Sequence, residues 1–275
     1  MTQTHSGTGK PAPARTAGAR HNPRLVRNVA SGITQLEHAH TNVFLVVERG
    51  AAGGRGVTLV DTGLPGTWRY LRHALSAIDR DLDDLKAVVL THAHFDHLGM
   101  ARRLQQELSI PIWAHGREWY LAAHPYRYAH ESSRLSYAAR YPMALPIIGR
   151  MAAAGALRVP GVESLEDLAN SDELDVPGRP RLIFTPGHTY GHTALHFPDR
   201  DAVITGDALV TLDPYTGFEG PQIVSGAATA DSAMALASLQ DLVATGARVA
   251  LPGHGDPWRD GIRSAVTEAL ERGPS

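Results

Sequence analysis

The chain of 275 residues contains no cysteine. Without thiols it can form no disulfide framework, use no cysteine nucleophile and offer no thiolate to zinc. A metal site in this chain therefore has to be built from imidazole and carboxylate groups. The sequence supplies 15 histidines and 28 acidic residues from which such a site could be made.

Long apolar runs and a strong net charge are also missing. No run of about 18 apolar residues occurs, so no transmembrane segment is expected. The formal net charge is −2, which gives no field that attracts nucleic acid, and no nucleic-acid partner is expected. Residues 1–22 lack the apolar centre of a secretory signal. We expect them to form a disordered tail on a cytoplasmic protein whose single domain spans residues 23–275.

The densest group of metal-binding side chains lies between His92 and His97. The segment reads H-x-H-x-D-H, with His94 and Asp96 between the two ends, and it follows the apolar run at residues 85–91. Two histidines at positions i and i+2 can converge where the backbone turns out of a strand. Imidazole and carboxylate together suit zinc, and also iron or manganese. The ordered spacing and the strand-to-helix context predict a metal site.

Three more candidate ligands stand alone, each after a short apolar segment and next to a glycine. They are His188 after residues 181–184, Asp207 after residues 202–205, and His254 after residues 248–251. Turns at strand ends are where rigid scaffolds place chemistry. Taken singly, each could be an ordinary turn residue. Together with the first group they predict one site.

The chain resembles the metallo-β-lactamase superfamily on these residues and on Asp61 in the segment Asp61-Thr62-Gly63. The resemblance implies two metal ions, most simply two Zn²⁺, with Fe or Mn as alternatives. It assigns His92, His94 and His188 to the first metal and Asp96, His97 and His254 to the second. It makes Asp207 the bridge between them and Asp61 a residue that orients a ligand from behind.

The resemblance also implies a mechanism. A hydroxide that bridges the two metals would attack an ester, thioester or lactone of a small-molecule substrate, and Asp96 would orient it and move a proton. No G-x-S-x-G turn and no nucleotide-phosphate loop occurs in the sequence. The sequence by itself names neither the substrate, nor the native metal, nor the oligomeric state.

Strand and helix patterns alternate along the chain in two rounds. Pattern alone gives a layered α/β protein, and the resemblance implies a four-layer αββα sandwich. We predict strands near residues 33–36, 43–47, 57–60, 85–91, 110–114, 181–186, 193–197, 202–206 and 248–252. We predict helices near residues 68–78, 98–108, 230–244 and 262–271.

Residues 116–168 interrupt this rhythm and carry five of the chain's eight tyrosines. We predict a helical insertion that lies as a lid near the metals, with Tyr126, Tyr128 and Tyr137 as candidate substrate-binding residues. Tyr190, two positions after His188, is a further candidate. A packed structural subdomain, or a surface that faces a partner or a membrane, are the alternatives.

Details of the sequence narrow the activity within the family. Absence of cysteine argues against one type of zinc β-lactamase, and the presence of Asp207 argues against the histidine-rich type. His94 stands where flavin-coupled members carry Glu. Tyr215 lies later than the tyrosine that quorum-quenching lactonases place after the bridging aspartate. Two hypotheses stay open: a dinuclear hydrolase of an ester, thioester or lactone, and a mononuclear iron oxidoreductase like the persulfide dioxygenases.

Overall fold

Seven strands build the first sheet of the computed structural model, which describes residues 23–48, 54–168 and 172–275. Strands β1 to β4 run antiparallel to their neighbours, and β4 to β7 run parallel. In spatial order the strands are β1 (Arg24–Ala30), β2 (Ile33–His38), β3 (Thr41–Val47), β4 (Val57–Val60), β5 (Leu85–Val89), β6 (Ile112–Ala114) and β7 (Glu166–Asp167).

The second sheet has four strands, in the order β13-β10-β9-β8. Strands β10 and β13 are parallel, whereas β9 is antiparallel to both of its neighbours. The strands are β8 (Arg181–Phe184), β9 (Thr193–Phe197), β10 (Ala202–Gly206) and β13 (Val249–Pro252). A separate hairpin pairs β11 (Val210–Leu212) with β12 (Glu219–Gln222).

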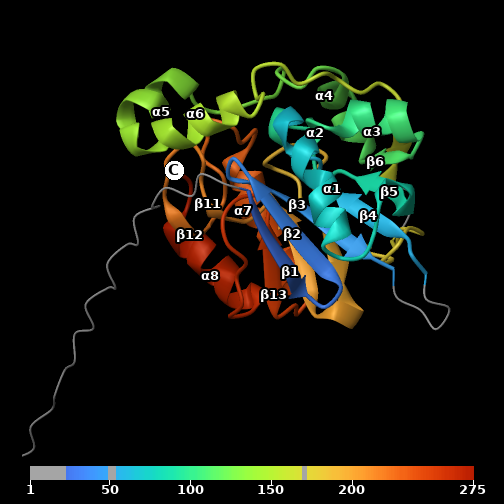
Figure 1. Cartoon of the computed structure of the whole chain (residues 1–275). Helices are drawn as coiled ribbons and strands as arrows, with labels where there is room; N and C mark the ends of the chain where they lie inside the picture. The colour runs from blue at the N-terminus through green and yellow to red at the C-terminus, as the bar shows by residue number, and fades with distance from the viewer. Residues whose placement is uncertain (1–22, 49–53, 169–171) are drawn as a thin grey trace, which may run out of the picture.

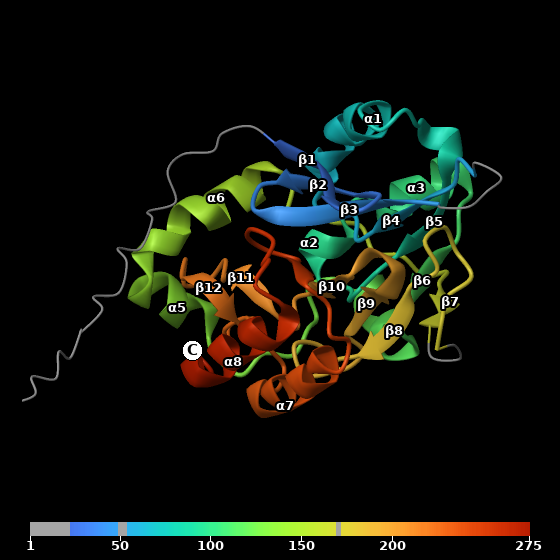
Figure 2. The same cartoon turned by 90° about the horizontal axis from the view of Figure 1, so that it is seen from below.

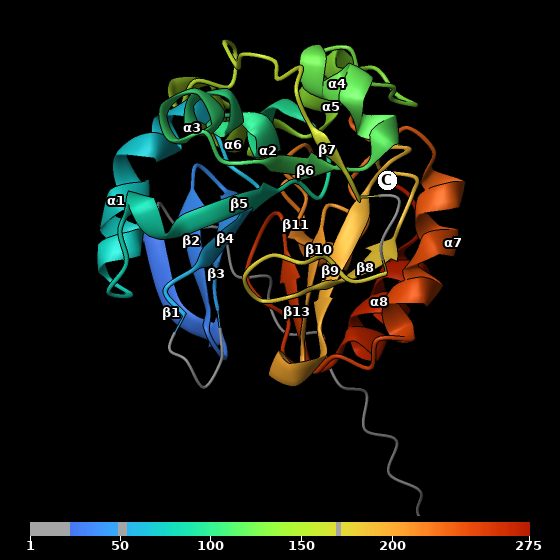
Figure 3. The same cartoon turned by 90° about the vertical axis from the view of Figure 1, so that its right-hand side faces the viewer.

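Helices cover the outer faces of both sheets, so the molecule has the four layers of an αββα sandwich (Figures 1 and 3). On the first sheet lie α1 (Trp68–Ser76) and α3 (Ala101–Leu108), and the short helix α2 (Phe95–Leu98) follows the end of β5. On the second lie α7 (Ser232–Val243) and α8 (Ile262–Arg272). Between β6 and β7 the chain forms α4 (Trp119–Ala123), α5 (Arg134–Arg140) and α6 (Leu145–Ala153).

Alternating side chains build one core between the sheets and one on each outer face. On β3, Phe44 and Val46 point to the core between the sheets, while Val43 and Leu45 join the core beneath α1 and α3. Residues of the second sheet divide in the same way, and Val203 packs against α7 and α8. Figure 2 shows the two sheets facing each other between these helices. The predicted four-layer α/β sandwich is therefore confirmed.

The strands and helices match the predicted segments closely, with informative differences. The helix predicted over residues 98–108 begins at Ala101, since Leu98 is the last residue of the separate short helix α2. Between the two helices, Gly99 lies against the backbone of Gly63 and Leu64. A Cβ on Gly99 would come within 2.4 Å of the Gly63 carbonyl oxygen. Strand β1 was not predicted, since its polar residues follow no strict alternation at the sheet edge and Asn28 has a φ of 51°. Strand β7 lies inside the segment for which no strand was predicted.

The predicted tail at residues 1–22 lies outside the described residues. Within the described part, no helix is both long and apolar enough to cross a membrane.

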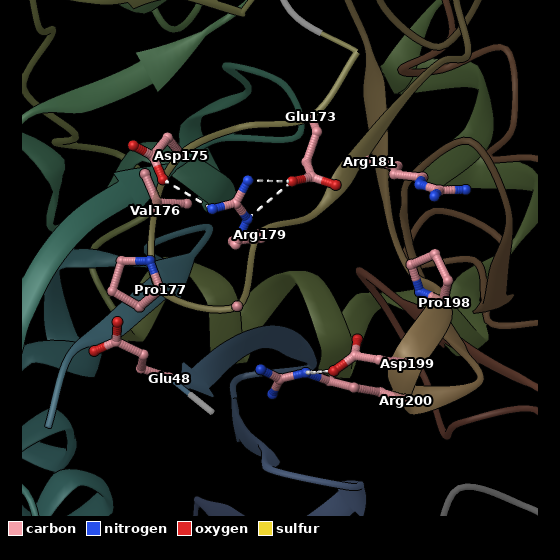
Figure 4. Close-up of a pocket in the computed structure, with 11 residues that line it drawn as sticks. Glu48, Glu173, Asp175, Val176, Pro177, Arg179, Arg181, Pro198, Asp199 and Arg200 are labelled. Atoms are coloured by element: carbon pink, nitrogen blue, oxygen red, sulfur yellow. Dashed lines mark hydrogen bonds and ion pairs between the residues drawn. The ribbon is translucent and has the colours of Figure 1, made fainter. Parts of the chain in front are cut away.

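The two ends of the sandwich differ in character. Strand β3 runs from Thr41 at one end to Val47 at the other. The next residue, Glu48, lines a polar pocket of about 470 Å³. Charges in this pocket pair with each other, and Figure 4 shows Arg179 between Glu173 and Asp175. Arg200 donates to the Val47 carbonyl at 2.7 Å and joins the two sheets there. Histidines gather at the opposite end of the strands.

Candidate metal centre

The predicted ligands lie together at one edge of the sandwich, because they follow strands of both sheets that end there. His92 and His94 leave β5, and Asp96 and His97 lie in α2. From the second sheet come three more residues, each after a different strand: His188 after β8, Asp207 after β10 and His254 after β13. All seven side chains are buried.

Their ligand atoms fall into groups of three that lie within 4.8 Å of one another. One group is His92, His94 and His188, another is Asp96, His97 and His254, and a third joins His92, His97 and Asp207. The first two groups are the sets that the resemblance assigns to two metals, and the third connects them. This cluster of imidazoles and carboxylates is consistent with a pair of metal ions.

Asp207 lies between the two groups. Its Oδ2 is 3.5 Å from Nε2 of His188 and 3.2 Å from Nε2 of His254, which belong to different groups. Its Oδ1 is 3.5 Å from Nε2 of His97. A carboxylate in this position can offer one oxygen to each of two cations.

The ring nitrogens that face away from the cluster have partners in the protein. Nδ1 of His97 is 2.9 Å from Asp61 Oδ2, and Nδ1 of His254 is 2.7 Å from the His40 carbonyl oxygen. Nδ1 of His92 is 3.0 Å from the Thr91 hydroxyl. Such contacts fix ring orientation and tautomer and leave Nε2 for a metal.

His94 is arranged differently, since its Nδ1 lies 2.9 Å from His188 Nε2. Inside the cluster, Nε2 of His92, Nε2 of His97 and Oδ1 of Asp207 are buried and have no hydrogen-bond partner among the described residues. Buried polar atoms are costly when unpaired, and several lone pairs aimed at one space are what a cation satisfies. The residues present therefore fit a metal pair.

Burial keeps the first group of histidines neutral. Desolvation is the main reason that the pKa of His94 falls to about 3, and it lowers the pKa of His92 and His188 as well. A neutral imidazole is the form that binds a metal, so this group is ready to ligate at neutral pH.

The second group behaves in the opposite way. Burial disfavours charge on His254, but Asp207 and Asp96 outweigh it and raise its pKa to about 10. For His97, burial also opposes the charge, and the same carboxylates raise the pKa well above its usual value. In the metal-free protein, protons on these two rings supply the positive charge that a metal would bring.

His192 was missed by the sequence reasoning, although the spacing of His188 and His192 resembles one helical turn and was a usable signal. Its Nε2 accepts hydrogen bonds from the backbone N–H groups of Asp207 at 3.0 Å and Ala208 at 3.2 Å. Gly206 precedes this turn with a φ of +50°, and a Cβ there would lie 2.7 Å from the ring. His192 therefore sets the position of Asp207, and both of its ring nitrogens have partners within the protein.

Glu118 was also missed, because a carboxylate in an arginine-rich segment looks like a surface residue. It is buried and accepts backbone hydrogen bonds from Ala93 and Gly191, both at 2.8 Å. Burial, its largest influence, raises the pKa of this carboxyl. One side chain at the start of the insertion thus ties together the loops of His92–His97 and His188.

The candidate tyrosines lie in different places. The ring of Tyr128 is 4.2 Å from the ring of His94. Tyr126 bonds the Ala156 carbonyl at 2.9 Å, within the insertion. The hydroxyl of Tyr137 donates to the Ser275 carbonyl. Tyr190 is 46% exposed beside the His188 loop.

Tyr215, which comes late in the sequence, lies at the site in space. Its hydroxyl is 3.2 Å from that of Tyr128. Asp213 holds the turn that carries it, accepting from the Tyr215 N–H at 2.9 Å. Burial, the largest cause, raises the pKa of Tyr215 well above its ordinary value and keeps the hydroxyl protonated.

The metallo-beta-lactamase superfamily model matches residues 38–254. The chain belongs to this superfamily. Probable metallo-hydrolase YflN of Bacillus subtilis (strain 168) is 26% identical over 226 residues, which are 78% of this chain and 81% of the relative. A hydroxyacylglutathione hydrolase of Cereibacter sphaeroides is 43% identical over 70 residues, which are 25% of this chain and 27% of that protein.

Among solved structures, TTHA1623 in a di-iron-bound form has a TM-score of 0.57 and 24% identity, covering 84% of this chain and 95% of its own. This likeness shows the shared fold. The family, the curated relative and the buried cluster together support a metal-dependent hydrolase.

Proposed function

We propose that the protein is a dinuclear metallohydrolase that cleaves a carboxylic ester, thioester or lactone. The observation that carries the proposal is the pair of buried three-residue groups joined by Asp207. In the overall reaction, water adds across the acyl–oxygen or acyl–sulfur bond and gives an acid and an alcohol or thiol. When bound, two divalent cations would lower the pKa of a water and polarise the carbonyl.

The chain's own residues supply position and proton transfer. His92, His94 and His188 would hold one cation, Asp96, His97 and His254 would hold the other, and Asp207 would hold both in place. The Oδ2 atom of Asp96 is 3.2 Å from His254 Nε2, so one of its oxygens faces the cluster. The same carboxyl group orients the attacking water and accepts its proton.

Asp61 contacts the side of the His97 ring that faces away from the cluster. Besides holding His97, it accepts from the Thr91 N–H at 2.8 Å and so links β4 to the end of β5. It keeps the His97 ring turned toward the cluster and raises the basicity of this ligand.

The choice of metal is open to experiment, and zinc is our first expectation, with iron or manganese as alternatives. A relative of the same fold holds two irons. The complete second group supports the hydrolase over a mononuclear iron oxidoreductase of the persulfide dioxygenase kind.

The test combines metal analysis with a substrate panel. Protein purified without added metal is assayed for zinc, iron and manganese, and then offered a 4-nitrophenyl ester, a thioester, a lactone and a phosphodiester. About two metals per chain and cleavage of a carboxylic substrate are expected. About one iron per chain with oxygen uptake on a persulfide would replace the proposal by the oxidoreductase.

Two matched variants locate the activity. Asp207→Asn keeps the shape of the side chain but removes its charge, and we expect loss of the metal pair and at least about a hundredfold lower kcat. Asp260→Asn makes the same change on an exposed residue after β13. Normal metal content and parental turnover in Asp207→Asn would show that this residue does not bridge.

A further inference from the structure

Arg134, the first residue of α5, brings a positive charge from the insertion to the wall of the metal centre. Its guanidinium carbon lies 4.1 Å from the centre of the Tyr128 ring, and that ring is itself 4.2 Å from the ring of His94.

No acidic partner accounts for this charge. No hydrogen bond or ion pair joins the side chain of Arg134 to another residue in the described part of the chain, and its Nε is buried without a partner. The nearby carboxylate of Glu131 is used elsewhere, on the N–H and hydroxyl groups of Ser232. A guanidinium normally uses its fork of donors, so an unused fork beside a polar site has capacity for a ligand.

The positive charge of a metal-loaded site bears on the position of the Arg134 guanidinium. Asp96 and Asp207 offset only part of the charge of two divalent cations, so a further cation nearby is unfavourable for the protein alone. A substrate that brings a negative group relieves this repulsion and fills the free donors. Arginine binds carboxylate and phosphate oxygens in the same bidentate way.

We propose that Arg134 binds an anionic group, a carboxylate or phosphate, on the substrate of the metal centre, and so selects acidic esters or thioesters over neutral ones. The proposal rests on the hydrolase function for its kinetic test but not for its binding test. The ring of Tyr128 positions the guanidinium through the cation–π contact.

The kinetic test compares two substrates that differ in one charge, on the zinc-loaded protein. They are 4-nitrophenyl butyrate and the 4-nitrophenyl monoester of glutaric acid. We expect kcat/KM to favour the glutarate ester, and Arg134→Met to lower this preference about tenfold or more. Arg134→Lys should restore part of it, because the charge returns without the fork.

The matched control is Arg140→Met. Arg140 lies on the same helix and stacks on Tyr141 at 5.4 Å, so the substitution removes an equivalent charge and cation–π contact elsewhere. It should leave the preference for the glutarate ester unchanged. Equal losses in the Met variants of both arginines would mean that the effect is general and that the proposal is wrong.

Calorimetric titration of glutarate and of inorganic phosphate into the same proteins gives a readout independent of turnover. Binding of either anion should weaken about tenfold in Arg134→Met and not in Arg140→Met, and the anion that weakens more identifies the group that is recognised. If the parent hydrolyses neither ester, the hydrolase proposal fails while this titration still decides the role of Arg134. Anion binding that is absent from the parent, or the same in parent and Arg134→Met, overturns the inference.

Discussion

At the scale of single residues, the centre depends on side chains that bind no metal. His192 is the strongest case, because its ring accepts two backbone hydrogen bonds from the turn of Asp207. Burial, the largest cause, lowers its pKa to about 3, so the ring is neutral and can act as acceptor. His192 therefore fixes the position of the Asp207 carboxylate through the backbone of its turn.

We expect His192→Phe to fold but to bind metal poorly. The phenyl ring fills the space, while two buried N–H groups lose their acceptor at a cost of about 1–3 kcal/mol each. Metal analysis should show less than the parental content, with activity at least about tenfold lower. His196→Phe, on strand β9 directly after His192, is the control and should keep both. Parental metal content in His192→Phe would contradict the positioning role.

Protons and metals compete for the second group of ligands. The pKa values of His97 and His254 are raised, the latter to about 10, so both rings are protonated in the metal-free protein at neutral pH. Metal uptake at pH 7 should then release at least about two protons per chain. Because protonated rings cannot ligate, metal affinity falls as pH decreases. Calorimetry in two buffers of different ionisation enthalpy measures the release, and a value near zero would contradict these pKa directions.

At the scale of elements, the insertion has both structural and site-facing residues. Helix α6 packs Ile147 and Met151 against Leu64 and Leu212, which anchors the insertion to the sandwich. Tyr126 bonds the Ala156 carbonyl and the Val159 N–H, so it braces the insertion. Tyr128 instead contacts His94.

Because Tyr126 and Tyr128 lie in different surroundings, we expect different results when each is replaced by phenylalanine. Tyr126→Phe should lower stability by about 1–2 kcal/mol, because two hydrogen bonds are lost, and should change substrate preference little. Tyr128→Phe should change kcat and KM on the ester panel, since its hydroxyl lies beside Tyr215 at the cluster. Tyr120→Phe, at a 59% exposed residue, is the control. Thermal unfolding and ester kinetics of the three variants separate bracing from substrate contact.

The sequence predicted the strands and helices better than it predicted the side-chain contacts between them. The strands that carry the ligands have strong apolar patterns, and the H-x-H-x-D-H segment and the isolated residues all follow such strands. Glu118 and His192 were not predicted as site residues, because their contacts arise only when a loop and a turn pack against the cluster. Tyr215 was counted as too distant in sequence, yet the turn held by Asp213 brings it back.

At the scale of the whole molecule, the ligands join the two sheets. His92, His94 and His97 follow the end of β5 in the first sheet, whereas His188, Asp207 and His254 follow strands of the second. Hydrogen bonds between the two sheets also hold this edge, and the side-chain amide of Asn42 makes two of them. Asn42 of β3 donates to the carbonyls of Pro252 and Gly255, both at 2.8 Å. A metal pair would add a second clamp at the same edge.

Metal removal should therefore weaken the whole fold and not one loop. A ligand at about a thousandfold excess over its Kd stabilises the folded state by about 4 kcal/mol per site. Two sites together should therefore shift the Tm of a domain of this size by about 20 °C. Chelation should lower Tm of the parent by this amount, and zinc should restore it. In Asp207→Asn, where the link between the sheets is weakened, the same treatment should change Tm much less. An unchanged Tm after complete metal removal from the parent would mean that metal binding does not help to hold the two sheets together.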